Sequence, residues 1–186
     1  KQNDFATESI NLYKAVLKKF FKWQNKGTYP ECVAWIRIGK TKSLKLPEDL
    51  LNQDEVKLLL KAATAPRDKA ILSVLWESGA RIGEIGSLQL KNVSFDEYGC
   101  QIMVDGKTGM RRIRLVNSAP ALLEWINLHP FNDNPNTWLW INLHRDRGEL
   151  MGYRHIEKIL VNIAEKAGVK KKVNPQNFRH SRATYL

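Results

Sequence analysis

The sequence predicts an α+β fold that is mainly α-helical and carries a small antiparallel β-sheet. Two observations predict this class. Apolar residues recur at helical spacing through much of the chain, whereas residues 100–116 alternate apolar and polar residues on both sides of an Asp-Gly turn, as a β-hairpin does. Apolar residues make up 43% of the 186 residues, which is enough to form a buried core.

The chain divides into two segments of different composition. Thr7 is placed to cap a first helix, and Gly27 is placed to end it. Residues 37–45 then form a basic, non-periodic segment that is typical of a linker. We therefore expect a helical front segment over residues 1–46 and a separate domain over residues 47–186.

The second segment carries clear start and stop signals for helices. Asn52 and Glu55 form a capping box, and Pro66 and Gly79 begin and end the helix that follows. Further elements are expected as a short helix over residues 81–88, a hairpin over 100–116, helices over 119–128 and 153–167, and an extended segment over 138–143. The apolar stripe of the helix over 153–167, which begins at Tyr153, is assigned to the core.

The charge of the chain favours a polyanionic partner. Lys and Arg number 30 against 19 Asp and Glu, so that the formal net charge is +11. Ten basic and three acidic residues lie within residues 1–46. Four lysines recur there at every fourth position: Lys14, Lys18, Lys22 and Lys26. Such a row is typical either of a solvated helix face or of a surface that contacts DNA phosphates, and the local charge excess favours the second interpretation.

Composition excludes several classes of protein. The longest apolar run, residues 70–76, is too short to span a bilayer, and no targeting segment is visible. Cys32 and Cys100 are too few for a disulfide framework and lack the spacing of metal ligands. We therefore expect no membrane, no metal and no cofactor.

Two cationic side chains lie where packing alone does not explain them. Arg81 follows Gly-Ala at a helix start, where free backbone N–H groups favour anions. Glu84, one turn later, is placed to orient a guanidinium. Lys107 lies at the predicted hairpin tip, within Gly-Lys-Thr-Gly.

The last helix adds a third cation. It is capped by Asn174 and is expected to run to the end of the chain. Gln176, Arg179 and His180 stand at positions i, i+3 and i+4, so they share one face. The planar fork of arginine matches two phosphate oxygens at once. We expect the three cations to meet in one pocket that binds a phosphodiester.

These motifs resemble three signatures of the tyrosine recombinase (phage integrase) family. Residues 79–85, Gly-Ala-Arg-Ile-Gly-Glu-Ile, are similar to its first arginine box. Residues 106–109, Gly-Lys-Thr-Gly, followed by Arg111 and Arg112, are similar to its hairpin lysine. Residues 176–184, Gln-Asn-Phe-Arg-His-Ser-Arg-Ala-Thr, are similar to its second box, and the three occur in the family's order and approximate spacing.

The resemblance implies a reaction and a role for each cation. Members cut one DNA strand by attack of a tyrosine hydroxyl, keep the bond as a 3′-phosphotyrosine and rejoin a different strand without metal or ATP. Arg81 and Arg179 would stabilise the charge that develops on the phosphate, and Lys107 would protonate the leaving 5′ oxygen. His180 would support Arg179. The implied DNA contacts are Lys14, Lys18, Lys22, Lys26, Arg111, Arg112 and Arg182.

Two departures from the family pattern bear on activity. Gln176 takes the position that is usually histidine, and an amide cannot shuttle protons. The family's nucleophilic tyrosine lies well downstream of the second box, and Tyr185, six residues after Arg179, sits roughly 240° round the helix from it. We therefore expect a catalytic domain truncated before its nucleophile, which binds DNA but does not cleave it covalently.

The resemblance also implies a parent protein. It is expected to be a prokaryotic or phage site-specific recombinase or integrase, tetrameric on double-stranded DNA, cytoplasmic and nucleoid-associated. Residues 1–46 are expected to hold the last helix of its core-binding domain, and the fragment is expected to be monomeric in solution. Two other functions stay open: a non-catalytic DNA-binding relative, which Gln176 favours, and an enzyme of the type IB topoisomerase kind.

Overall fold

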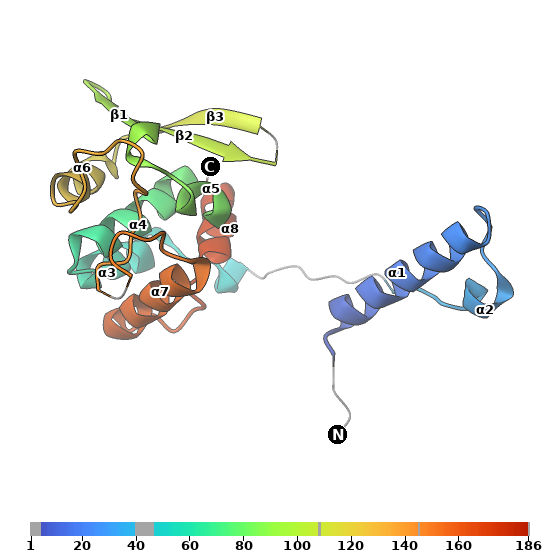
Figure 1. Cartoon of the computed structure of the whole chain (residues 1–186). Helices are drawn as coiled ribbons and strands as arrows, with labels where there is room; N and C mark the ends of the chain where they lie inside the picture. The colour runs from blue at the N-terminus through green and yellow to red at the C-terminus, as the bar shows by residue number, and fades with distance from the viewer. Residues whose placement is uncertain (1–4, 40–46, 108, 145, 186) are drawn as a thin grey trace. The chain divides into compact units, whose positions relative to one another are not determined.

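The computed structural model describes residues 5–39, 47–107, 109–144 and 146–185. The chain divides into two compact units, Lys1–Lys45 and Leu46–Leu186 (Figure 1). Among the described residues the fold is mainly helical with one three-stranded antiparallel sheet, which confirms the predicted class. No helix in this part of the chain is long and apolar enough to cross a membrane.

The first unit contains two helices, α1 (Thr7–Gln24) and α2 (Glu31–Ala34). The cap of α1 is Ala6, so Thr7 is the first helical residue and not the predicted cap. The helix ends at Gln24, earlier than predicted, and the chain then turns through Lys26 and Gly27, which both have positive φ. None of the described residues of α1 is buried.

The second unit contains the remaining helices. They are α3 (Gln53–Ala62), α4 (Pro66–Ser78), α5 (Ile82–Gly86), α6 (Ala119–Asn127), α7 (Tyr153–Ala167) and α8 (Pro175–Thr184), with 3-10 turns η1 (Pro47–Asp49) and η2 (Leu90–Asn92). The predicted capping box is present, because Asn52 accepts from the backbone of Glu55 and Glu55 accepts from the backbone of Asn52. Gly79 ends α4 in the left-handed conformation, with φ 54°. Asn174 caps α8 by accepting from the backbone N–H of Asn177.

The sheet has the strand order β1-β2-β3. Strands β2 (Gly99–Gly106) and β3 (Gly109–Leu115) form the predicted hairpin, with Gly106 opposite Gly109. Strand β1 (Val93–Asp96) was not predicted, because four residues are too few to establish a period. The segment over 138–143 forms isolated bridges rather than a strand.

Helix α4 lies at the centre of the second unit. Its residues 70–75 are all buried, and the helix packs against α3, α6, α8 and β3 (Figure 1). The fully buried Trp140 donates its indole N–H to the carbonyl of Ile85 in α5, over 2.8 Å. Phe178 of α8 is also fully buried, with its ring 6.4 Å from that of Trp76. The core therefore fixes α5, which follows Arg81, and α8, which contains Arg179.

The last helix ends before the predicted point. Helix α8 stops at Thr184, and Tyr185 serves as its C-cap, so the helix does not continue in full to residue 186. The ring of Tyr185 lies 6.1 Å from that of Trp76. This contact places the Tyr185 ring beside α4.

Candidate phosphate-binding site

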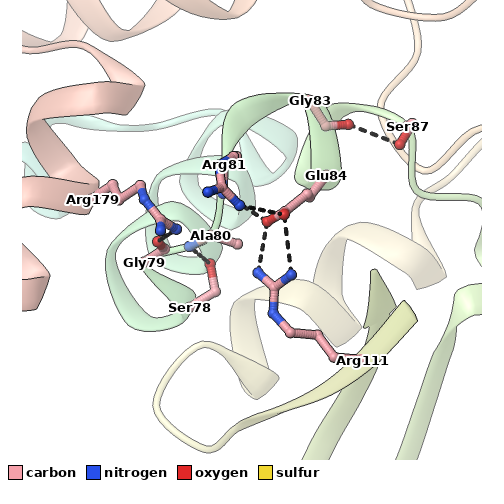
Figure 2. A network of polar contacts seen from close by, with 9 residues as sticks. All are labelled: Ser78, Gly79, Ala80, Arg81, Gly83, Glu84, Ser87, Arg111 and Arg179. Atoms are coloured by element: carbon pink, nitrogen blue, oxygen red, sulfur yellow. Dashed lines mark hydrogen bonds and ion pairs between the residues drawn. The ribbon is translucent and has the colours of Figure 1, made fainter. Parts of the chain in front are cut away.

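Arg81 lies in the short loop between α4 and α5, where it is the N-cap residue of α5. Its backbone N–H donates to Oε2 of Glu84 over 2.9 Å, and its Nη1 donates to Oε1 of the same carboxylate over 3.2 Å (Figure 2). Half of its side chain, 50%, stays exposed. The loop therefore holds Arg81 at its backbone and at one nitrogen and leaves the rest of the guanidinium toward solvent.

Arg179 comes from α8, a hundred residues further along the chain. Its Nη1 donates to the carbonyl oxygen of Gly79 over 2.7 Å (Figure 2). Gly79 is two residues before Arg81, so this bond ties α8 to the loop that carries the first arginine. Phe178 faces the core, and Arg179 lies about 100° round α8 from it, where its side chain is half-buried.

The two arginines line one pocket of about 340 Å³. Its lining residues are Arg81, Ile82, Tyr153, Pro175, Gln176, Arg179 and His180. Four of the five residues predicted to be catalytic therefore line the same pocket. The fifth, Lys107, does not line it. Gln176 and His180 are exposed, so that both are accessible to a bound anion.

Lys107 lies in the turn between β2 and β3 and is exposed. It is not among the residues that line the pocket. Its neighbour Gly106, however, packs against Glu84: a Cβ atom at Gly106 would lie 2.2 Å from Oε1 of Glu84. The hairpin tip therefore touches the carboxylate that holds Arg81, and Lys107 is the next residue along the chain.

Glu84 is buried and accepts from two arginines. Besides Arg81, it binds Arg111 of β3, whose Nη1 and Nη2 donate to Oε1 and Oε2 over 3.0 and 2.7 Å (Figure 2). The hydrogen bonds from Arg111 are the main cause that lowers the pKa of Glu84 from 4.5 to about 2, against the effect of burial. Glu84 is therefore ionised at neutral pH and binds two guanidinium groups instead of the single one predicted.

The predicted DNA-contacting arginines lie in three different settings. Arg111 uses both terminal nitrogens on Glu84. Arg112, the next residue on β3, is exposed. Arg182 lies over the ring of Trp76, 6.0 Å from its centroid, and lines a second pocket apart from Arg81 and Arg179. Of these three side chains, Arg112 is the one whose setting best suits a DNA contact.

The predicted lysine row is shorter than the sequence suggested. Lys14, Lys18 and Lys22 lie on α1, but the helix ends before Lys26. Lys18 donates to the carbonyl of Ile36 over 3.0 Å. The ammonium groups of Lys18 and Lys22 lie 4.9 and 5.0 Å from the centroid of the Tyr29 ring. Two of the four lysines are thus partly engaged within the first unit.

Tyr153 is a pocket residue that sequence reasoning assigned to the core. Its side chain is 46% exposed, and it lines the pocket from the first turn of α7. Burial and the nearby Glu157 raise the pKa of its phenol above the ordinary value. Tyr153 is the first residue of α7, at the end of the apolar stripe. That terminal position is the signal that could have distinguished it from the buried residues of the stripe.

Glu77 has a structural role that was not predicted from the sequence. It accepts from the backbone N–H groups of Val116, Asn117 and Ser118 over 2.7–3.0 Å, and also from the Ser118 hydroxyl. Burial raises the pKa of Glu77, but these hydrogen bonds together lower it below its ordinary value. Glu77 therefore fixes the chain between β3 and α6.

Among the described residues, no group of three or more His, Cys, Asp or Glu is placed to hold a metal ion.

Comparison with known proteins identifies the family of this chain. Residues 49–186 match the model of the phage integrase family, and the chain belongs to that family. It is 28% identical over 189 residues to tyrosine recombinase XerA of Pyrococcus horikoshii, covering all of this chain and 62% of that protein. It is 25% identical to tyrosine recombinase XerD of Staphylococcus aureus strain N315, covering 97% of this chain and 63% of that one. The resemblance drawn from the three motifs is confirmed.

Solved structures share the fold. A crystal structure of XerA recombinase matches with a TM-score of 0.66 at 27% identity, over 97% of this chain and 62% of that one. XerH site-specific recombinase in a post-cleavage complex with its difH substrate matches with a TM-score of 0.75 at 21% identity, over 99% of this chain and 55% of that one. The chain spans about three fifths of the length of the relatives it matches.

Proposed function

We propose that this chain is the DNA-binding and phosphate-binding part of a site-specific tyrosine recombinase. It holds one phosphodiester of double-stranded DNA between Arg81 and Arg179 while a tyrosine hydroxyl attacks the phosphorus. The observation that carries this proposal is the 2.7 Å hydrogen bond from Arg179 to the carbonyl of Gly79, which brings the two guanidinium groups into one pocket.

The proposed chemistry follows from the donors that the two arginines keep. A guanidinium has five N–H donors, and each arginine uses a single terminal nitrogen for a protein contact, Nη1 in both cases. The donors that are left can bind the non-bridging oxygens, where negative charge increases in the transition state. Because these cations and Lys107 supply the charge that a metal ion would otherwise provide, we propose that cleavage is metal-independent.

The remaining polar residues complete the proposed site. Lys107 protonates the leaving 5′ oxygen, and the close approach of its neighbour Gly106 to Glu84, the partner of Arg81, supports this role. His180 and Gln176 line the pocket and add hydrogen bonds to phosphate oxygens. The amide of Gln176 does not ionise and cannot act as a general acid or base. We therefore propose only a hydrogen-bonding role for Gln176.

The attacking tyrosine is proposed to lie downstream of residue 186, as the family resemblance implies. The contact of Tyr185 with Trp76, outside the arginine pocket, supports this. These 186 residues alone then bind DNA without forming a covalent adduct. Tyr153, which does line the pocket, is the tyrosine to test as an alternative nucleophile.

The proposed partner is double-stranded DNA, in the cytoplasm of a prokaryotic cell at its nucleoid. The net charge of +11 supports binding to a polyanion. We propose that the parent protein is tetrameric on DNA and that the 186-residue chain alone is monomeric. A lambda integrase tetramer on a Holliday junction shares the fold, with a TM-score of 0.70 at 14% identity.

Trapping a covalent intermediate tests the proposal. The protein is expressed from the complete reading frame and used to select the duplexes that it binds from a random library. A nick is then introduced into the selected duplexes so that cleavage cannot be reversed. Wild type is expected to form a protein–DNA adduct, with or without chelator. Arg81→Ala and Arg179→Ala are expected to bind the same duplexes and form no adduct, and Tyr153→Phe to react like wild type. An Arg81→Ala variant that reacted at the wild-type rate would refute the assignment.

Gln176 favours a second candidate, a relative that binds recombination sites without cutting them. Under that function wild type forms no adduct although it binds DNA tightly. The Gln176→His variant discriminates between the two functions. If adducts form in the variant alone, the parent is a non-catalytic DNA-binding protein that retains the rest of the site.

A further inference from the structure

The carboxylate of Glu84 is shared unequally by its two arginines. Arg111 meets it with two nitrogens, over 2.7 and 3.0 Å, whereas the side chain of Arg81 meets it with one, over 3.2 Å (Figure 2). Planar, two-bond pairing of this kind is the stronger contact. Glu84 is 3% exposed, and the side chains of Arg81 and Arg111 are 50% and 36% exposed. The buried acid is therefore mainly the partner of Arg111.

Because Glu84 pairs mainly with Arg111, the positive charge of Arg81 is not neutralised by Glu84. The three side chains together carry one net positive charge, because Arg111 balances Glu84. If Arg111 were absent, the carboxylate would pair with Arg81 alone, and that pair would be neutral. A buried carboxylate without Arg111 would also draw the Arg81 guanidinium closer, since an incompletely paired buried charge is costly. Arg81 would then have fewer donors and less charge for a phosphate.

The same contact joins the hairpin to the arginine loop. Arg111 stands opposite Val104 in the β2–β3 register, and Gly106, two residues after Val104, packs directly on Glu84. Lys107 follows Gly106, so its Cα lies about 3.8 Å further along the chain. Two contacts to one carboxylate, from Arg111 and from Gly106, thus set the place of the turn that carries Lys107.

We propose that Arg111 is a positioning residue that acts through Glu84. By pairing with Glu84 it leaves the positive charge of Arg81 available for the phosphate, and it fixes the Lys107 hairpin against the Arg81 loop. The inference rests on the proposed function, since the phosphate is the anion that Arg81 binds there.

The test compares two arginines of one strand. Arg111→Met removes the contact with Glu84. Arg114→Met is the matched control, because it removes the same charge from β3, where Arg114 pairs with the partly exposed Asp96. The probe is inorganic phosphate, titrated into the ¹⁵N-labelled 186-residue chain while the Nε–H signal of Arg81 is followed by NMR. Phosphate is expected to bind at Arg81 about tenfold more weakly in Arg111→Met than in wild type or Arg114→Met.

A double variant separates positioning from a general loss of structure. In Arg111→Met combined with Glu84→Gln the acid that would capture Arg81 is gone, so phosphate affinity at Arg81 is expected to return toward the wild-type value. Removing the carboxylate also removes the cost of an incompletely paired buried charge, so urea unfolding of each variant is measured and the phosphate affinities are compared under conditions where all variants are folded. Equal affinity in Arg111→Met and Arg114→Met, or a double variant as weak as Arg111→Met, overturns the proposal.

Hydrogen exchange supplies a readout that does not need phosphate. The backbone amides of Gly106 and its register partner Gly109 are expected to exchange about tenfold faster in Arg111→Met, and at the wild-type rate in Arg114→Met. If Arg111→Met does not fold, Arg111→Gln replaces it, since glutamine removes the charge but keeps a hydrogen-bond donor for Glu84. Exchange and phosphate affinity at wild-type levels in Arg111→Gln contradict the proposal. Failure of the complete protein to form a DNA adduct rejects the proposed function and leaves these two measurements valid.

Discussion

Arg179 donates from Nη1 to the carbonyl oxygen of Gly79 over 2.7 Å, across a hundred residues of sequence. Gly79 accepts this bond at the turn where α4 ends in the left-handed conformation, with φ 54°. That turn directs the chain to Arg81 two residues later. One residue of α8 therefore takes part in the pocket and also holds the loop that supplies the other arginine.

Arg179→Lys is expected to reduce strand cleavage by about 100-fold or more, since the single nitrogen of an ammonium cannot span Gly79 and a phosphate as the planar guanidinium does. The measurement is the rate of adduct formation by the protein from the complete reading frame on nicked duplexes. Arg114→Lys, the same substitution in a pair with Asp96 on β3, serves as the control and is expected to react like wild type. Cleavage by Arg179→Lys at the wild-type rate would contradict the role given to Arg179.

Gly106→Ala is expected to lower the free energy of unfolding by about 1–3 kcal/mol, because its Cβ would lie 2.2 Å from Oε1 of Glu84. That oxygen is held by two arginines and cannot move aside freely. Gly83→Ala is the control, since a Cβ there meets nothing within 4 Å and alanine suits the interior of α5. Urea unfolding of the three proteins measures the difference. Equal stability of Gly106→Ala and wild type would show that the hairpin does not press on Glu84.

Glu84 is expected to stabilise the fold at neutral pH and to lose this effect in acid. Its pKa is lowered from 4.5 to about 2, chiefly by the hydrogen bonds from Arg111. A carboxyl whose pKa is lower in the folded state contributes stability above its unfolded value, and this contribution is lost as the pH falls from about 4.5 to about 2. The free energy of unfolding of wild type should therefore fall more steeply over this interval than that of Glu84→Gln.

Urea unfolding at several pH values measures these slopes. Asp54→Asn is the control, because Asp54 is 85% exposed and pairs with an exposed Lys57. Its profile is expected to follow that of wild type. Parallel profiles for Glu84→Gln and wild type would show that Glu84 does not change its protonation with folding.

The two cysteines are expected to differ in reactivity. Cys32 is exposed, whereas Cys100 is buried and burial raises the pKa of its thiol to about 11. At pH 8, iodoacetamide should modify Cys32 in the folded protein and reach Cys100 only after urea is added. Peptide mass spectrometry before and after unfolding identifies the modified residue. Rapid modification of Cys100 in the folded protein would contradict its burial in the sheet.

Features that depend on neighbours a few residues apart could be predicted from the sequence. The Asn52–Glu55 capping box and the Asn174 cap involve positions three residues apart, and Gly79 ends α4 through its own backbone freedom. The β2–β3 hairpin was also predictable, because its turn and its alternation are contiguous. Each of these predictions is confirmed.

Features that depend on long-range contacts could not be predicted. The pairing of Arg111 with Glu84 could not be predicted, because Glu84 lies 27 residues earlier, in another element. The fourth lysine of the α1 row was misplaced because nothing in the sequence showed that the helix ends at Gln24. For the same reason the sequence indicated that two arginines share a pocket, but not that Gly79 is the residue that joins them.

The bond between Arg179 and Gly79 has a consequence for protein synthesis. Residues 79–84 leave the ribosome long before α8 has been translated, so a nascent chain at that stage has one half of the anion pocket. The pocket can close only after residue 180 has emerged and α8 has docked on α4. Until then the growing polypeptide carries Arg81 without Arg179, so the pocket between the two arginines forms only when α8 docks on α4.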